Sequence, residues 1–169
     1  MSGRSPPQQK RPFQEAIKEF SDFYAKKIIT SQQTFDSEYL KEVPEVITGE
    51  HHLIKDPKTE VVFKLRAKDY MCNFFGSIHG GYMASLIDHL TSVVGVAYYG
   101  DYSYQSVSVQ LKLDYVKSIR AGQDFYVHCQ LNKQGKTLLF TTCTIFNQDF
   151  EICYTGSHTK YRLPTSPKL

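Results

Sequence analysis

One apolar stretch, YMASLIDHLTSVVGVAYY from Tyr82 to Tyr99, constrains the fold of this chain more than any other feature. Its apolar residues occupy nearly every side of a helix, a pattern typical of a helix that other structure encloses. Gly100 and Asp101 are expected to end this helix. The remaining segments must therefore supply the layer that covers it.

Strand-like segments lie on both sides of this predicted helix. Alternation of apolar and polar residues between turn signals predicts strands at Glu45 to Ile54, Thr59 to Ala67, Gln105 to Val116, Phe125 to Leu131, Leu138 to Phe146 and Ile152 to Tyr161. One buried helix followed by an antiparallel meander predicts an α+β fold. A length of 169 residues fits one domain with an extension.

The chain divides into three predicted regions. Residues 1–40 form an N-terminal extension, with a polar start that is expected to be disordered and then a helix. From Phe13 to Ile29, apolar residues at steps of three or four give one stripe, which predicts a helix that docks on the domain. The domain itself is expected over residues 41–163, followed by a tail at 164–169.

Composition and charge exclude several kinds of function. The net charge of +3 is too small for a nucleic-acid-binding face, and no apolar run is long enough to span a bilayer. Four dispersed cysteines without a CxxC pair indicate neither a zinc site nor disulfides, so we expect an intracellular protein without a metal or cofactor. The ending Pro167-Lys168-Leu169 resembles a peroxisomal address, which leaves cytoplasm, mitochondrion and peroxisome open.

His79, Gly80 and Gly81 stand where the long helix begins. Two glycines there expose backbone N–H groups at the positive end of the helix, where the first turn has no internal acceptors. These groups are suited to polarise a carbonyl oxygen and to stabilise an oxyanion. A tight turn before a helix is the simpler explanation of a glycine pair and stays open here.

Asp88 is the one acidic residue of the apolar helix. An unpaired carboxylate in such surroundings is costly, so this residue serves either structure or function. Gly80 and Asp88 are eight residues apart, roughly 12 Å along a helix axis, and one reacting carbonyl cannot touch both. If both act on one substrate, the aspartate comes from a second copy of the chain, and the site lies across a dimer interface.

Four sequence motifs then carry a resemblance to a known family. NFFGSIHGGYMASLID, SVSVQLKLDYV, KQGKTLLFT and GSHTKY follow one another in order between Asn73 and Tyr161. They resemble the hotdog thioesterases of the PaaI-like group, most closely the acyl-CoA thioesterase 13 (thioesterase superfamily member 2) subfamily. The resemblance implies an antiparallel sheet wrapped around a long central helix. It also implies hydrolysis of fatty or aromatic acyl-CoA by a homo-oligomer, expected to be a dimer of dimers.

The same resemblance implies roles for four residues. Asn73 resembles the side-chain donor that holds the thioester oxygen together with the Gly80 N–H. Asp88 resembles the carboxylate that acts as a general base on water, or as a nucleophile. Ser108 resembles the hydroxyl that orients this water, and the nearby Ser106 stays open as an alternative. Because a thioester is already activated, a base, a water and an oxyanion site suffice without a catalytic triad or a metal.

Contacts to the CoA moiety are implied at the helix start, at a strand end, in a turn and on the last strand. The residues are His79, Gly81, Tyr115, Lys117, Arg120, Lys133, Gln134, Gly135, Lys136, Thr137 and Tyr161. The basic side chains among them are suited to phosphate groups as charged donors. Without the resemblance, solvated surface lysines would be the simpler explanation.

Two other functions compete with hydrolysis. A catalytically weak hotdog module would bind acyl-CoA as a sensor or carrier, and fold alone does not distinguish it from an enzyme. A hotdog dehydratase would need a catalytic Asp–His pair in a motif that this chain lacks. The joint presence of Asn73, Gly80, Asp88 and Ser108 favours the hydrolase, because a binding module has no need of that carboxylate.

Overall fold

The computed structural model of this chain describes residues 45–47, 59–99 and 105–164. Its elements in chain order are β1 (Glu45–Ile47), β2 (Glu60–Arg66), the 3-10 helix η1 (Asp69–Met71), α3 (Gly80–Tyr99), β3 (Ser106–Tyr115), β4 (Asp124–Gln134), β5 (Leu138–Asn147) and β6 (Ile152–Arg162). The α+β prediction is confirmed. The predicted docking helix at residues 13–29 and residues 48–54 of the first predicted strand lie outside the described residues.

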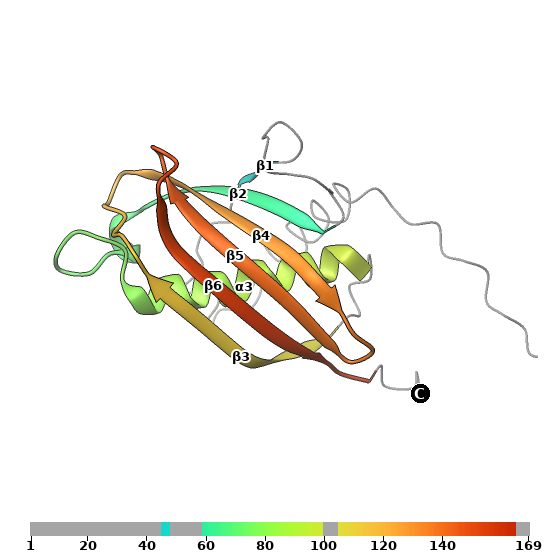
Figure 1. Ribbon diagram of the computed structural model, residues 1–169. Helices are drawn as coiled ribbons and strands as arrows, with labels where there is room; N and C mark the ends of the chain where they lie inside the picture. The colour runs from blue at the N-terminus through green and yellow to red at the C-terminus, as the bar shows by residue number, and fades with distance from the viewer. Residues whose placement is uncertain (1–44, 48–58, 100–104, 165–169) are drawn as a thin grey trace, which may run out of the picture.

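The strands form one antiparallel sheet in the order β1-β2-β4-β5-β6-β3. The helix α3 lies across one face of this sheet and contacts β3, β4, β5 and β6 (Figure 1). Within the described part of the chain, β3 has a single neighbouring strand, β6, and forms an edge of the sheet. No helix in the described ranges is long and apolar enough to cross a membrane.

The core lies between α3 and the sheet. Its fully buried residues include Met83, Ile87 and Leu90 from the helix, with Val127 and Ile145 from β4 and β5. The helix residues are three or four positions apart, which gives α3 one apolar face. Alternate residues of the strands point to the same face of the sheet and complete the core. Burial of these side chains supplies the main favourable free energy of the fold.

The prediction that α3 is enclosed on nearly every side is only partly correct. A second face of the helix remains partly or fully exposed, formed by Gly81, Ala84, Ser85, Asp88 and Ser92. The physical reason is that the sheet covers only one side of the helix. Most of these residues are small or polar, so their partial exposure carries little hydrophobic cost.

Replacement of Leu90 by alanine tests the helix–sheet core. This side chain is 1% exposed, and its loss leaves a cavity under the sheet. We expect the free energy of unfolding to fall by about 2–5 kcal/mol in urea titrations at fixed protein concentration. Ser85→Ala on the open face serves as the control and should change it by less than about 0.5 kcal/mol. Equal effects of the two substitutions would contradict this account of the core.

Candidate functional site

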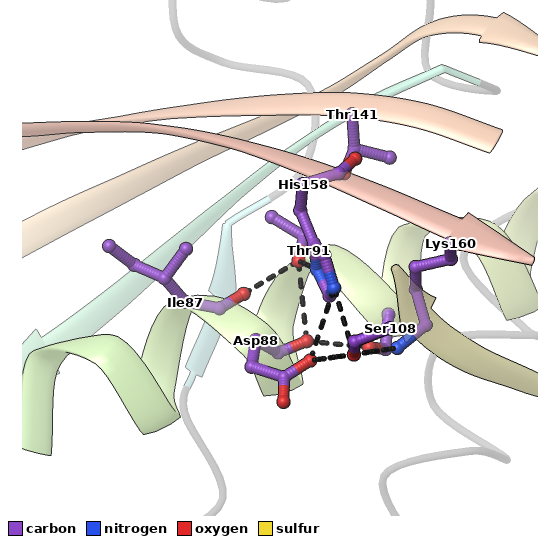
Figure 2. A network of polar contacts seen from close by, with 8 residues as sticks. Ile87, Asp88, Thr91, Ser108, Thr141, His158 and Lys160 are labelled. Carbon is purple, nitrogen blue, oxygen red and sulfur yellow. Dashed lines mark hydrogen bonds and ion pairs between the residues drawn. The ribbon is translucent and has the colours of Figure 1, made fainter. Parts of the chain in front are cut away.

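Asp88 is the centre of a polar cluster between α3 and the strands β3 and β6 (Figure 2). Its Oδ1 accepts a hydrogen bond from the Ser108 hydroxyl at 3.1 Å and lies 3.4 Å from His158 Nε2 and 3.5 Å from Lys160 Nζ. Oδ2 has no hydrogen-bond partner among the described residues, and the side chain is 46% exposed. One carboxylate oxygen is therefore fixed while the other remains accessible.

The pairing of β3 with β6 brings these groups together. Ser108 lies directly opposite Lys160 in the register, and a shift between Ser108 and Gln110 marks a bulge beside this pair. A bulge re-aims side chains locally. His158 and Lys160 are two residues apart on one strand, so both point to the face that α3 covers. The structure thus supports Ser108, rather than the neighbouring Ser106, as the hydroxyl that contacts Asp88.

His158 is completely buried and connects two hydroxyl groups. Its Nδ1 lies 2.7 Å from Thr91 Oγ1, and its Nε2 lies 3.0 Å from Ser108 Oγ. Burial, and then the Lys160 ammonium, lower the pKa of His158 from 6.5 to about 4, while the Asp88 carboxylate opposes this shift. The imidazole is therefore neutral at pH 7 and carries one ring N–H.

The direction of the hydrogen bonds follows from the acceptors. A carboxylate can only accept, so the Ser108 hydroxyl donates to Asp88 Oδ1. The Thr91 hydroxyl donates to the Ile87 carbonyl at 2.6 Å, one turn back along α3. His158 lies between the two hydroxyls, and the tautomer of its ring sets which nitrogen donates. The imidazole therefore connects Thr91 on α3 with Ser108 on β3.

A second cluster lies at the beginning of α3, in the loop that precedes it. Asn73 Oδ1 accepts hydrogen bonds from the backbone N–H of Phe75 at 3.0 Å and of Ser77 at 3.4 Å. Gly76 closes the same turn with its N–H on the Asn73 carbonyl at 3.0 Å, and its φ of 74° favours glycine. Because the amide oxygen of Asn73 is held inside the loop, its Nδ2 is left as the outward donor.

Gly80 provides the other donor of this cluster. Its N–H has no hydrogen-bond partner in the described part of the chain, and its carbonyl accepts from the Tyr115 hydroxyl at 3.1 Å. A side chain at position 80 would place its Cβ 3.1 Å from the Tyr115 ring, and the ring would have to shift by a few tenths of an ångström to make room. The Gly81 N–H donates to His79 Nδ1 at 3.0 Å, so the sequence-based idea that it is a free donor is wrong.

The four predicted catalytic residues form two separate pairs within one chain. Ser108 contacts Asp88, whereas Asn73 belongs to the loop that leads into Gly80. Gly80 and Asp88 stand on the same helix, eight residues or roughly 12 Å apart. One thioester carbonyl held at Gly80 is therefore out of reach of the Asp88 carboxylate of the same chain.

The residues implied for CoA also separate into two groups. Tyr115 pairs with Tyr154 at one end of β6, while Tyr161 at the other end pairs with Leu138 beside the β4–β5 turn. The two ends are seven residues or roughly 23 Å apart. The first group also holds His79, Gly81, Lys117 and Arg120, and the second Lys133, Gln134, Gly135, Lys136 and Thr137.

The basic side chains of the two groups differ in their partners. Lys117 forms an ion pair with Glu151, and Glu151 also accepts from Asn147. This ion pair raises the pKa of the Lys117 ammonium. Lys133 and Lys136 are exposed and have no ion-pair partner in the described ranges. The end of β4 and the turn after it therefore carry positive charge without an acidic partner among the described residues, unlike Lys117.

His158, Lys160 and Thr91 were not predicted from the sequence. His158 and Lys160 belong to the GSHTKY motif, in a segment that alternation had predicted to be a strand. Two polar residues at i and i+2 share one face of a strand, which is the signal that would have paired them. Nothing in the sequence alone tells which face is buried, because that depends on the pairing with β3.

Comparisons with known proteins show which family this chain resembles. A family model described as the thioesterase superfamily matches residues 75–154. Acyl-coenzyme A thioesterase 13 of Homo sapiens is 26% identical over 118 residues, which cover 69% of this chain and 83% of the human protein. A Pseudomonas aeruginosa protein with the name "putative esterase" is 30% identical over 95 residues, which cover 54% of this chain and 67% of that protein.

A solved structure extends the likeness to the fold. The crystal structure of zebra fish thioesterase superfamily member 2 matches with a TM-score of 0.69 at 25% sequence identity, over 88% of this chain and 98% of that chain. An antiparallel sheet over one long helix is the hotdog fold, so the fold prediction is confirmed for the described residues. The chain belongs to the thioesterase superfamily and is a thioester hydrolase.

The buried imidazole of His158 predicts a pH-dependent stability. Its pKa is about 4 in the folded chain and near 6.5 when exposed, so between these values the unfolded state binds more protons. We expect the free energy of unfolding to fall by up to about 3 kcal/mol as the pH drops from 6.5 to 4. Urea titrations across this range should show a smaller fall for His158→Asn. The exposed His79, changed to Gln, serves as the control; equal pH dependence in all three proteins would contradict the assignment.

Proposed function

We propose that this protein hydrolyses acyl-CoA thioesters to a free acid and CoA at a site shared between two copies of the chain. The observation that carries this proposal is the state of Asp88, with Oδ1 held and Oδ2 open. The likeness to acyl-coenzyme A thioesterase 13 supports CoA as the leaving group. Fatty and aromatic acyl groups are both within the proposal.

The exposed edge of strand β3 supports the involvement of a second copy of the chain. Its Val107 and Val109 are 47% and 60% exposed, and the strand edge away from β6 is unpaired among the described residues. A ten-residue edge with exposed valines invites pairing with another strand. Twofold pairing of two such edges would also set the open faces of two α3 helices beside each other. A dimer of dimers remains part of this proposal.

In the shared site, each chain contributes one half. The Gly80 N–H and the Asn73 amide of one copy would hold the thioester oxygen, and Asp88 of the other copy would hold the water. Asp88 Oδ2 takes one proton as the water oxygen bonds to the carbonyl carbon, and negative charge collects on the held oxygen. Collapse of this intermediate breaks the C–S bond, and the thiolate takes up a proton to give CoA and the carboxylic acid.

Binding of the CoA phosphates is proposed at the exposed basic groups. Lys133 at the end of β4 and Lys136 in the β4–β5 turn lie at the end of β6 nearest Lys160, and so on the Asp88 side of the molecule. Arg120 lies at the opposite end, on the Gly80 side. In a shared site, each half would thus bring its own basic residues to the ligand. Lys117 is a weaker candidate, because Glu151 already compensates its charge.

Replacement of Asp88 by asparagine tests the base. We expect kcat to fall by about 10²–10⁴-fold with little change in KM, because the substitution removes the proton acceptor and keeps the shape. Release of CoA thiol from acyl-CoAs of graded length, including phenylacetyl-CoA, measures the rates. Asp124→Asn is the matched control, since Asp124 pairs with Lys64 and Arg66 on β2. Undiminished hydrolysis in Asp88→Asn would exclude the mechanism. If the wild-type protein binds acyl-CoA without hydrolysing it, the alternative function of an acyl-CoA sensor or carrier would be favoured.

Mixing two inactive variants tests whether the site is shared. Asn73→Ala removes one half of the site and Asp88→Asn the other half. In a mixed dimer, one of the two sites keeps both intact halves. Equal mixing after dissociation should therefore restore up to about one quarter of wild-type activity per chain, for random re-association of a twofold dimer. Verified mixed dimers without recovered activity would contradict the shared site.

A further inference from the structure

Lys160 is the one buried cation among the lysines and arginines of the described residues, with 7% of its surface exposed. Its Nζ lies 3.3 Å from Ser108 Oγ and 3.5 Å from Asp88 Oδ1. His158 on the same strand and Asp88 on α3 are the titratable groups that face it, and Ser108 on β3 is its third neighbour. The whole environment of this ammonium is therefore the Asp88 cluster.

Stability alone is a poor explanation for a cation in this place. Removal of an ammonium from water costs several kcal/mol, and its attraction to one carboxylate rarely returns more than that. Asp88 itself is 46% exposed and would be hydrated without a counter-ion. Asp88 therefore does not require Lys160 as a counter-ion, and the ion pair alone does not explain why Lys160 is buried.

The hydrogen-bond capacity of Ser108 gives that reason. Its oxygen has two lone pairs and one proton, and the proton is directed to Asp88 Oδ1. His158 Nε2 lies 3.0 Å from this oxygen, and the Lys160 ammonium donates to it at 3.3 Å. Three protein groups thus surround the Ser108 oxygen and fix its position.

We propose that Lys160 is a positioning residue for the hydrolysis, which fixes Ser108 and Asp88 Oδ1 so that Asp88 presents Oδ2 to the attacking water. This inference rests on the proposed function. Lys160 itself touches neither the substrate nor the water.

The titration of Lys160 provides a signature in the wild type. Burial lowers the pKa of the Lys160 ammonium from its ordinary value of 10.5, while Asp88 partly opposes this shift. When the ammonium loses its proton, Ser108 and Asp88 lose the charge that holds them. We therefore expect kcat to decline at alkaline pH, with a midpoint below 10.5, while KM stays constant.

Two substitutions separate charge from hydrogen bonding. Lys160→Met keeps the length of the side chain and removes both, whereas Lys160→Gln keeps a donor and removes the charge. We expect kcat to fall about 10- to 100-fold in Lys160→Met, and less in Lys160→Gln, with KM within about threefold of the wild type. Lys64→Met, on β2 beside Asp124, is the matched control and should leave kcat unchanged.

A double-mutant cycle distinguishes positioning from a structural role. If Lys160 acts through Ser108, the loss caused by Lys160→Met should be several-fold smaller in a Ser108→Ala background. Additive losses would overturn the positioning role, because a merely structural lysine would lower the melting temperature and leave the two effects independent.

The remaining outcomes are also decisive. Wild-type kcat in a folded Lys160→Met protein would overturn the inference, and loss of activity in Asp88→Asn alongside it would leave the proposed function intact. A wild-type chain without acyl-CoA hydrolysis would overturn both. If Lys160→Met does not fold, the pH profiles decide: an alkaline decline that persists unchanged in Lys160→Gln, or that is absent from the wild type, contradicts the role of Lys160.

Discussion

The pairing of β3 with β6 is the interaction on which the candidate site depends. This register puts Ser108 opposite Lys160 and turns both toward α3, where Asp88 stands. A slip of one residue would send every side chain of β3 to the other face of the sheet and separate the hydroxyl from the carboxylate. The bulge after Ser108 and the buried anchor at His158 both oppose such a slip.

Much of the fold was accessible from sequence because its signals are local. The apolar run at residues 82–99 and the alternating segments after residue 105 gave α3 and the strands β3 to β6 to within a few residues. The exposure of one helix face was not accessible, because periodicity tells which residues are apolar and not how many layers surround them. Asp88 was accordingly expected to be more buried than its 46% exposure.

The candidate site shows the same contrast between features that are local in sequence and features that only the folded structure brings together. Asn73, Gly80, Asp88 and Ser108 were found through short motifs, but their grouping into two pairs required the helix and sheet in space. His158 and Lys160 escaped because they are distant in sequence from Asp88 and meet it only through strand pairing. Gly81 was misjudged for a local reason, since the ring of the preceding His79 reaches forward to its N–H.

Strand β3 touches both halves of the candidate site. Its Tyr115 holds the carbonyl of Gly80, and its Ser108 holds Asp88. If two copies join at the edge of this strand away from β6, formation of the contact and completion of the site are one event. The hydrolytic activity per chain would then follow the monomer–dimer equilibrium. Dilution would lower this activity without any inhibitor, and the cellular concentration of the chain would set it.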